Sequence, residues 1–141
     1  MAEVFGVVIS VLTVAEMAGK LGSSVLRLQR LWREVQDVPE NINQLTRQLD
    51  LLRPILLDME SQHSDNDQTT TSLSIQYCHQ AVDELERLAE DLQRQIVSAK
   101  KSLRTITKLK VTFKKDAMRG YHERLQLSMH MLSLAQQTHL L

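Results

Sequence analysis

The spacing of leucine and other apolar residues constrains the fold of this chain more than any other feature. In the second half of the sequence these residues recur at alternating steps of three and four, at Cys78, Ala81, Leu85, Leu88, Leu92, Ile96, Ala99, Leu103 and Ile106. Such steps place side chains on one face of an α-helix, and a stripe of this length is typical of a bundle helix. We therefore expect a long helix whose apolar face packs against other helices.

Two earlier segments show the same helical period. The apolar positions of the first are Leu21, Val25, Leu28, Leu31, Trp32 and Val35. Those of the second are Ile42, Leu45, Leu49, Leu52, Leu56 and Met59. Pro39 suits the first turn of the second helix, where the missing N–H costs nothing. Pro54 lies inside this pattern, so we expect it to kink the helix or divide it near Arg53.

A closing helix is expected over residues 116–141. Its apolar positions are Met118, Tyr121, Leu125, Leu132 and Ala135, with Leu127, Met131 and Leu134 widening the face. It stops at a Leu-Leu pair without a cap, so we expect the chain to be part of a longer protein. Residues 109–113 read LKVTF and alternate like a strand, but because no partner strand is evident we expect a bend. Residues 61–72 contain no apolar side chain and are expected to form a loop, with Thr71 or Ser72 capping the next helix.

The opening segment, residues 4–15, has no charge and only two polar side chains, Ser10 and Thr13. Its β-branched residues favour a strand, but a lone strand has nothing to pair with, so a helix is expected. Twelve helical residues reach about 18 Å, which is too short for a hydrocarbon core of about 30 Å. No Lys or Arg precedes the segment, which argues against a secretion signal. We expect a helix buried among its neighbours, with Gly6, Gly19 and Gly22 softening it and marking its end.

Length and composition agree with one helical domain. A chain of 141 residues suits a single core, and its 4% aromatic content, four Gly and two Pro are more typical of long helices than of a β-sandwich or barrel. One cysteine cannot form an internal disulfide, so a reducing compartment is expected. The sequence predicts an all-α fold: a single bundle of four to five helices over residues 1–141, with an apolar N-terminal helix.

Charge is unevenly distributed although the net charge is zero. Residues 34–91 carry thirteen acidic side chains and only three basic ones, whereas residues 94–141 carry ten basic side chains and only two acidic ones. The basic side chains either pack beside the acidic block and neutralise it or face an anionic partner such as lipid headgroups. The sequence leaves both possibilities open, and they do not exclude each other.

No catalytic pattern stands out. The five histidines are scattered, and His122 and His130 have no third ligand at metal spacing. Cys78 falls on the apolar stripe, which favours a buried structural thiol over a nucleophile. Only Phe113 and Tyr121 lie among the late basic residues, which is too few aromatic side chains for a nucleic-acid surface. We expect no enzyme activity, no cofactor, no metal and no nucleic-acid partner.

Three stretches of the sequence resemble a known family. They are the glycine-punctuated apolar start MAEVFGVVISVLTVAEMAGK, the entry VPENI into a leucine-rich run, and the basic FKKD ahead of the closing leucine-rich helix. Over nearly the whole chain the pattern is similar to the HeLo-like N-terminal domain of fungal STAND (NLR-type) proteins and related cell-death effectors. These motifs are patterns of apolar and charged residues and include no catalytic signature.

The resemblance implies a membrane-permeabilising cell-death domain of a fungal immune or incompatibility protein. Such a domain is cytoplasmic at rest and moves to the plasma membrane when oligomerisation releases its N-terminal helix. The residues expected to insert are Val4, Phe5, Val7, Val8, Ile9, Val11, Leu12 and Val14. Glu3 and Glu16 would then face a shared aqueous lumen, or they are merely the exposed edge of a core helix. The residues expected to dock on anionic headgroups are Lys100, Lys101, Arg104, Lys108, Lys110, Lys114 and Lys115.

A second hypothesis needs no membrane. The same bundle would then be a non-lytic interaction or oligomerisation domain that regulates a downstream STAND NTPase. The chain has no GxxxxGK[ST] motif, so a nucleotide switch would lie in another module. The partners expected under the two hypotheses together are anionic membrane lipids, further copies of the chain and downstream modules of the parent protein.

Overall fold

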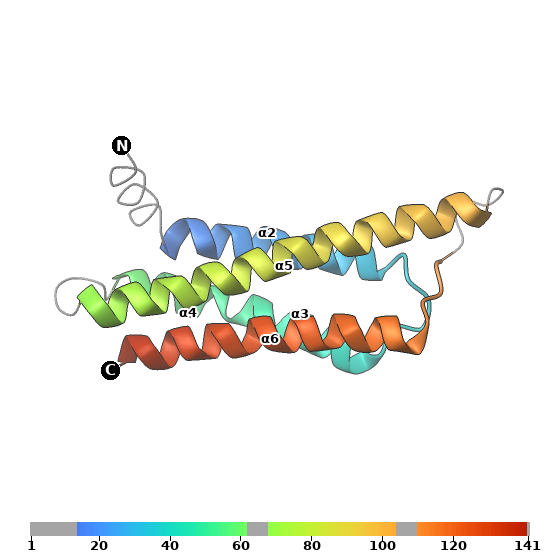
Figure 1. The fold of residues 1–141 in the computed structure, drawn as a ribbon. Helices are drawn as coiled ribbons and strands as arrows, with labels where there is room; N and C mark the ends of the chain where they lie inside the picture. The colour runs from blue at the N-terminus through green and yellow to red at the C-terminus, as the bar shows by residue number, and fades with distance from the viewer. Residues whose placement is uncertain (1–13, 62–67, 104–109, 141) are drawn as a thin grey trace.

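The computed structural model describes residues 14–61, 68–103 and 110–140. Its helices are α2 (Val14–Trp32), α3 (Glu40–Leu51), α4 (Arg53–Ser61), α5 (Gln68–Leu103) and α6 (Lys115–Leu140). Because α4 follows α3 almost directly, the two form one broken rod, and four rods lie side by side along a common direction (Figure 1). The predicted all-α bundle is confirmed.

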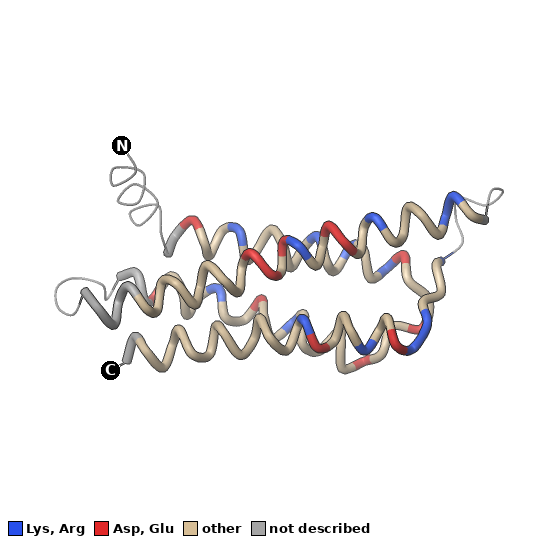
Figure 2. The backbone as a smooth tube through the Cα atoms, in the orientation of Figure 1, with Lys and Arg blue, Asp and Glu red and all other residues tan. Residues whose placement is uncertain are grey.

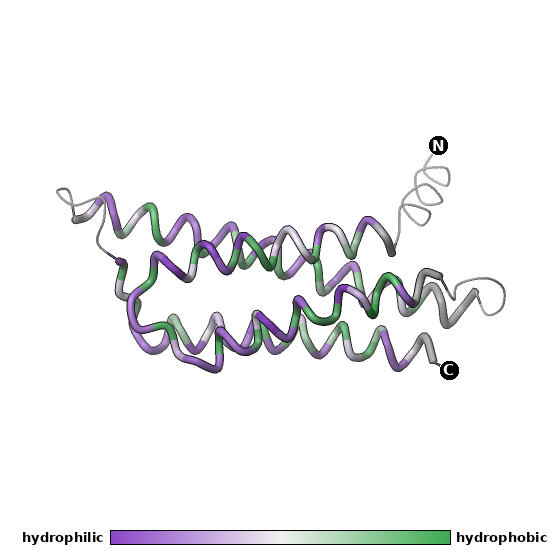
Figure 3. The backbone as a smooth tube through the Cα atoms, turned by 180° about the vertical axis from the view of Figure 1, so that it is seen from behind, coloured by the Kyte–Doolittle hydropathy of each residue, from purple (hydrophilic) through white to green (hydrophobic). Residues whose placement is uncertain are grey.

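The four rods surround one core. α5 lies against α2 on one side and α6 on the other, while α3 and α4 contact both α2 and α6. α2 and α5 run in the same direction, and α6 and the α3–α4 rod run the opposite way (Figure 1). Hydrophobic residues recur along every rod between hydrophilic ones, as an inward-facing stripe requires (Figure 3). The largest fully buried side chains are Met17, Leu21, Val25, Leu28, Ile42, Leu49, Leu56, Val82, Leu85, Leu88, Leu92 and Leu125.

The long stripe of apolar residues that begins at Cys78 lies on α5. Its members Cys78, Ala81, Leu85, Leu88, Leu92 and Ile96 are all buried, and Ala99 packs against them from a half-buried position. Ile106 lies outside the described residues. Two buried serine hydroxyls find hydrogen-bond acceptors across the α5–α6 contact, as buried polar groups usually do. Ser74 donates to the carbonyl oxygen of Ala135 at 2.7 Å, and Ser128 donates to the carbonyl oxygen of Ala81 at 3.3 Å.

Pro54 divides the second predicted helix as expected. α3 ends at Leu51 and α4 begins at Arg53. Proline has no N–H to donate and its ring clashes with the carbonyl four residues earlier, so the α-helical ladder stops there. It resumes immediately, since the N–H of Leu56 donates to the carbonyl oxygen of Leu52 at 3.0 Å.

Gly19 and Gly22 do not end a helix, so this part of the prediction is wrong, and Gly6 lies outside the described residues. α2 runs without interruption through Gly19 and Gly22 to Trp32, because burial of Leu21 and Val25 outweighs a glycine cost of about 1 kcal/mol. Gly22 instead makes room for a neighbour. A Cβ at this position would lie 2.7 Å from the Nη1 atom of Arg53 at the start of α4.

The polar segment 61–72 is only partly a loop. Ser61 is the last residue of α4, and α5 already begins at Gln68, so Thr71 and Ser72 lie inside α5 rather than at its cap. A nucleated helix lengthens at little cost, and polar residues such as Gln, Thr and Ser cost at most about 0.7 kcal/mol each in it. A prediction based on polarity alone therefore places the start of α5 too late in the sequence. Residues 62–67 lie outside the described part.

The expected bend before the closing helix contains a short piece of sheet. Val111 forms an isolated parallel bridge with Val35, which lies just beyond the end of α2. The N–H of Val111 donates to the oxygen of Glu34, and the N–H of Gln36 donates to the oxygen of Val111, both at 2.8 Å. The alternating LKVTF pattern did have a partner, and it was missed because the partner lies more than seventy residues away. No longer strand occurs in the described residues.

The opening apolar helix stays a prediction. Residues 1–13 lie outside the described part of the chain, and the described structure begins at Val14. Of the two predicted lumen carboxylates, Glu3 therefore cannot be placed, whereas Glu16 is exposed in the first turn of α2.

Candidate functional site at the basic end of the bundle

Four exposed lysines gather at one end of the bundle. Lys101 lies in the last turn of α5, Lys110 precedes the bridge residue Val111, and Lys114 and Lys115 flank the start of α6. Figure 2 shows these cations at the end where α5 finishes and α6 begins. We call this set, Lys101, Lys110, Lys114 and Lys115, the basic end.

Other predicted docking residues do not join the basic end. The ammonium of Lys100 lies 2.5 Å from the Oε1 atom of Glu34, in the link after α2, so its charge is already compensated within the fold. Arg104 and Lys108 lie outside the described residues. The structure therefore brings together four of the seven predicted docking residues.

The acidic and basic blocks do neutralise each other along part of their length. Arg124 of α6 places its Nε atom 2.6 Å from Glu84 and its Nη1 atom 2.8 Å from Asp91, both on α5. The hydrogen bond from Arg124 lowers the pKa of the Asp91 carboxyl, and a second one from Arg94 acts in the same direction. Burial opposes the charge of Arg124, but its bonds to Glu84 and Asp91 outweigh this effect and raise the pKa of the guanidinium.

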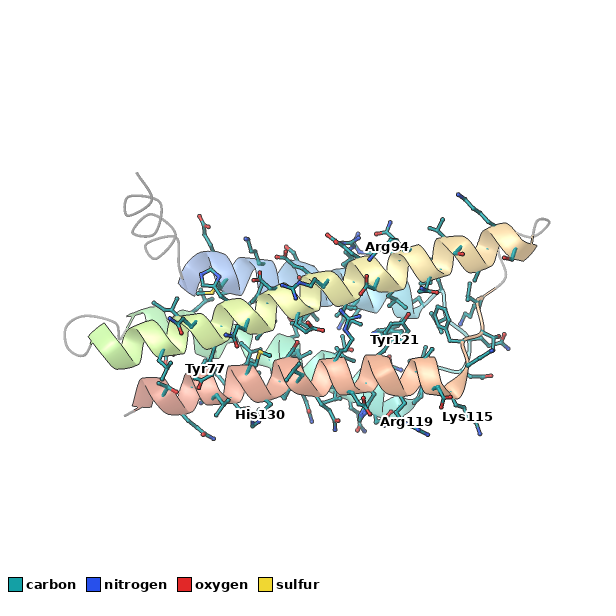
Figure 4. All side chains as sticks on the ribbon, viewed as in Figure 1. Tyr77, Arg94, Lys115, Arg119, Tyr121 and His130 are labelled. Atoms are coloured by element: carbon teal, nitrogen blue, oxygen red, sulfur yellow. The ribbon has the colours of Figure 1, made fainter. Side chains whose placement is uncertain are left out.

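Three aromatic rings support the basic end from inside. Tyr121 lies between α5 and α6 (Figure 4) and meets Trp32 edge-to-face at a centroid distance of 5.8 Å. Phe113 also meets Tyr121 edge-to-face, at 5.9 Å. Burial raises the pKa of the Tyr121 hydroxyl. Because Tyr121 is buried and Phe113 packs on it, these rings hold the two links of this end together.

Glu16 lies at the edge of a groove between α2 and α5. The groove is lined by Glu16, Lys20, Arg27, Glu86 and Glu90, among others. Carboxylates from two helices therefore line one groove, together with the cations Lys20 and Arg27. In this arrangement Glu16 faces solvent, and its role in a lumen stays a prediction.

The insertion segment and the docking lysines attach at opposite ends of the molecule. α2 begins at Val14, at the end of the bundle where α5 starts and α6 finishes, whereas α2 finishes at the basic end (Figure 1). α2 has 19 residues, so the two ends are separated by about 28 Å along this helix. The predicted inserting residues from Val4 to Leu12 lie outside the described part, and only the backbone of Val14 is placed.

Metal-ligand grouping, the single cysteine and helix apolarity can be assessed in the described residues. No group of three or more His, Cys, Asp or Glu side chains within residues 14–61, 68–103 and 110–140 is arranged to hold a metal ion. Cys78 is fully buried, and burial raises the pKa of its thiol to about 12, which agrees with a structural role. Within the same residues, no helix combines the length and apolarity needed to cross a bilayer.

Sequence reasoning missed two arginines near the basic end. Arg33 and Arg47 line the same pocket as Lys110. Arg47 was counted within the acidic block, and Arg33 lies outside both blocks. Only the fold brings them next to Lys110, because the Val35–Val111 bridge joins the link after α2 to the link before α6. Linear spacing carried no signal for this proximity.

Comparison with known proteins gives one match. No curated protein and no solved structure matches the chain. A family model described as "Pigment biosynthesis cluster protein PigL N-terminal" matches residues 2–138. This match fits the expectation of a fungal N-terminal domain and does not extend to the HeLo family. Because it covers almost the whole sequence, the chain belongs to the family of PigL N-terminal domains.

Proposed function

We propose that this domain is a membrane-directed effector module, similar to HeLo domains, that permeabilises the bilayer after self-association. The observation that carries the proposal is the basic end, where Lys101, Lys110, Lys114 and Lys115 are exposed and none forms an ion pair within the described part of the chain. Each such lysine contributes up to about 1 kcal/mol of attraction to an anionic leaflet when it lies close to the surface. The contrast with Lys100 and Arg124, whose charges are compensated, supports a surface kept for an external anion.

The geometry divides the proposed function into two separable steps. Docking uses the basic end, whereas insertion uses residues 4–14, which attach at the opposite end of α2. A bundle standing on its basic end holds Val14 about 28 Å above the surface. We therefore infer one of two arrangements. Either the bundle lies along the membrane, so that one copy both docks and inserts, or copies associate on the lipid, so that one copy docks while its neighbour inserts.

The direct test is dye release from sealed vesicles of phosphatidylcholine and phosphatidylserine. The deletion should remove residues 2–13 only, because Met17 and Ala18 are buried and a longer cut would damage the core. Loss of the apolar segment should abolish dye release, while vesicle binding persists because the basic end is intact. Unchanged release by the shortened protein would contradict the proposal.

A charge substitution makes a finer test. Val8→Glu should reduce dye release strongly, because a carboxylate at membrane depth is costly. The matched control is Val97→Glu, since Val97 is 45% exposed on α5 and a charge there meets water. Equal dye release by the two variants would argue against insertion of the segment.

The second hypothesis, a regulatory interaction domain, draws on exposed apolar side chains. Leu51 and Leu57, on either side of the Pro54 break, are 70% and 47% exposed. Such side chains are suited to a protein partner or a second copy. This hypothesis would be favoured if vesicles stay sealed while Leu51→Asp weakens self-association measured by analytical ultracentrifugation.

A further inference from the structure

A polar pocket opens beside the basic end. It is an open pocket lined by the last turns of α2, the link that follows α2, α3, and Lys110 next to the bridge residue Val111. Its volume is about 500 Å³. Three cationic side chains, Arg33, Arg47 and Lys110, face one carboxylate, Asp37, in its lining, so the pocket has an excess of positive charge.

Two of the three cations lack a compensating carboxylate. Arg47 pairs with Glu40 at 2.8 Å, whereas Arg33 and Lys110 form no ion pair in the described part of the chain. Arginine presents several N–H donors in a planar fork, and lysine adds a compact point charge. Together they suit a phosphate group, whose several oxygens can accept hydrogen bonds from both side chains at once.

The pocket wall also contains a donor that the protein leaves unsatisfied. Trp32 lines the pocket and is only 4% exposed, yet its indole Nε1–H has no acceptor among the described residues. Buried polar groups are nearly always hydrogen-bonded, so an orphan donor needs an explanation. Because the Nε1 atom itself is buried, an oxyanion in the pocket reaches it only if the indole ring shifts.

The backbone at the two cations is fixed in advance. Arg33 lies two residues before Val35, and Lys110 lies directly before Val111, the two residues of the parallel bridge. Its two 2.8 Å hydrogen bonds hold the links together, and the Lys100–Glu34 ion pair ties α5 to the same link. A ligand therefore does not have to bring the backbones that carry Arg33 and Lys110 together.

We propose that this pocket binds a phosphate group, with Arg33 and Lys110 as its charged ligands. The group is either free in solution or carried by a lipid headgroup. The lipid case rests on the membrane function proposed above, whereas the free case stands without it.

Fluorescence of the chain reports on the pocket directly, because Trp32 is its single tryptophan. Titration of the full chain with sodium pyrophosphate, at ionic strength held constant with sodium chloride, should give a saturable change in emission. Arg33→Gln and Lys110→Gln should each weaken this binding about tenfold through loss of a charge-assisted hydrogen bond. Lys20→Gln is the matched control, an exposed lysine near the opposite end of α2 and outside the pocket lining, and should bind pyrophosphate as tightly as the wild type. Circular dichroism confirms that each variant keeps its helices.

A second arm separates the two sources of phosphate. Phosphatidylcholine vesicles containing phosphatidic acid offer the same group on a lipid. If Arg33→Gln and Lys110→Gln weaken vesicle and pyrophosphate binding alike, and more than Lys115→Gln does, the pocket holds a headgroup. If they weaken pyrophosphate binding alone, the ligand is a free phosphate compound. Absence of saturable binding in both arms, or equal binding by the pocket variants and the wild type, overturns the proposal whatever dye release shows.

Discussion

Arg124 is one residue at which the acidic and basic blocks of the sequence meet. Its guanidinium, 28% exposed, lies between the carboxylates of Glu84 and Asp91. Arg119, on the same helix, lies 3.8 Å from Asp116, and both side chains are largely exposed. The two arginines carry the same charge, but water screens the ion pair of Arg119 much more than the ion pairs of Arg124, because Arg119 and its partner are far more exposed.

Replacement of Arg124 should therefore cost far more than replacement of Arg119. Arg124→Met should lower the free energy of unfolding by about 1–3 kcal/mol, because it leaves two partly buried carboxylates without their donor. Arg119→Met should change it by less than about 0.5 kcal/mol. Urea unfolding followed by circular dichroism measures both. Equal losses in the two variants would show that the contact between α5 and α6 does not depend on this ion pair.

Asp91 should make stability depend on pH. Hydrogen bonding to Arg124 lowers its pKa in the folded protein below the ordinary value of 3.8. Its contribution is therefore complete above about 3.8 and disappears as the pH falls through the lower folded value. Between pH 6 and pH 2.5, Asp91→Asn should lose less stability than the wild type in urea titrations. Asp116→Asn, whose side chain is 92% exposed, should follow the wild type.

At the scale of elements, the two glycines of α2 differ in what surrounds them. Nothing lies within 4 Å of a Cβ placed on Gly19, whereas Arg53 occupies that space at Gly22. Gly19→Ala should raise the free energy of unfolding by up to about 1 kcal/mol through helix propensity. Gly22→Ala should gain less, because the Arg53 side chain must move.

A double-mutant cycle tests this explanation. In an Arg53→Ala background, Gly22→Ala should recover the full gain seen at Gly19, while Gly19→Ala should be unaffected by the change at Arg53. Chemical denaturation of the variants measures the coupling. Additive effects of Gly22→Ala and Arg53→Ala would mean that the Arg53 side chain does not rest against Gly22 in solution.

The elements that rest on periodicity were predictable, and those that rest on distant contacts were not. Buried leucines at steps of three and four specify a helix by themselves, and Pro54 breaks one by its own covalent geometry. Gly22 was misread because its reason lies on α4. Val111 was misread because its partner lies beyond the end of α2. Thr71 and Ser72 were misread because polarity does not stop a helix that has already formed.

At the scale of the whole molecule, the four lysines of the basic end should act together. Replacing Lys101, Lys110, Lys114 and Lys115 with Gln should weaken binding to phosphatidylserine vesicles by at least about tenfold at low salt, given up to about 1 kcal/mol for each lysine near the surface. Because all four are exposed, the unfolding midpoint should change little. Vesicle co-sedimentation measures the affinity.

Salt provides the internal control for this variant. Wild-type binding to the vesicles should weaken steeply between about 50 and 300 mM sodium chloride, because salt screens surface charges increasingly over this range. Binding by the four-lysine variant should depend much less on salt. Identical salt dependence in the two proteins would assign the attraction to other residues. The sequence predicted the identity of these lysines, but their gathering at one end, remote from Val14, follows from the antiparallel course of α5 and α6.

The Val35–Val111 bridge has a consequence for selectivity. A cluster of cations on mobile loops attracts any anion in proportion to its charge. Here two backbone hydrogen bonds of the bridge hold the two links together and so fix the backbone positions from which the Arg33 and Lys110 side chains extend. We therefore expect anions of equal charge to bind this end with different affinities, according to how well their oxygens match the spacing of the two cationic side chains.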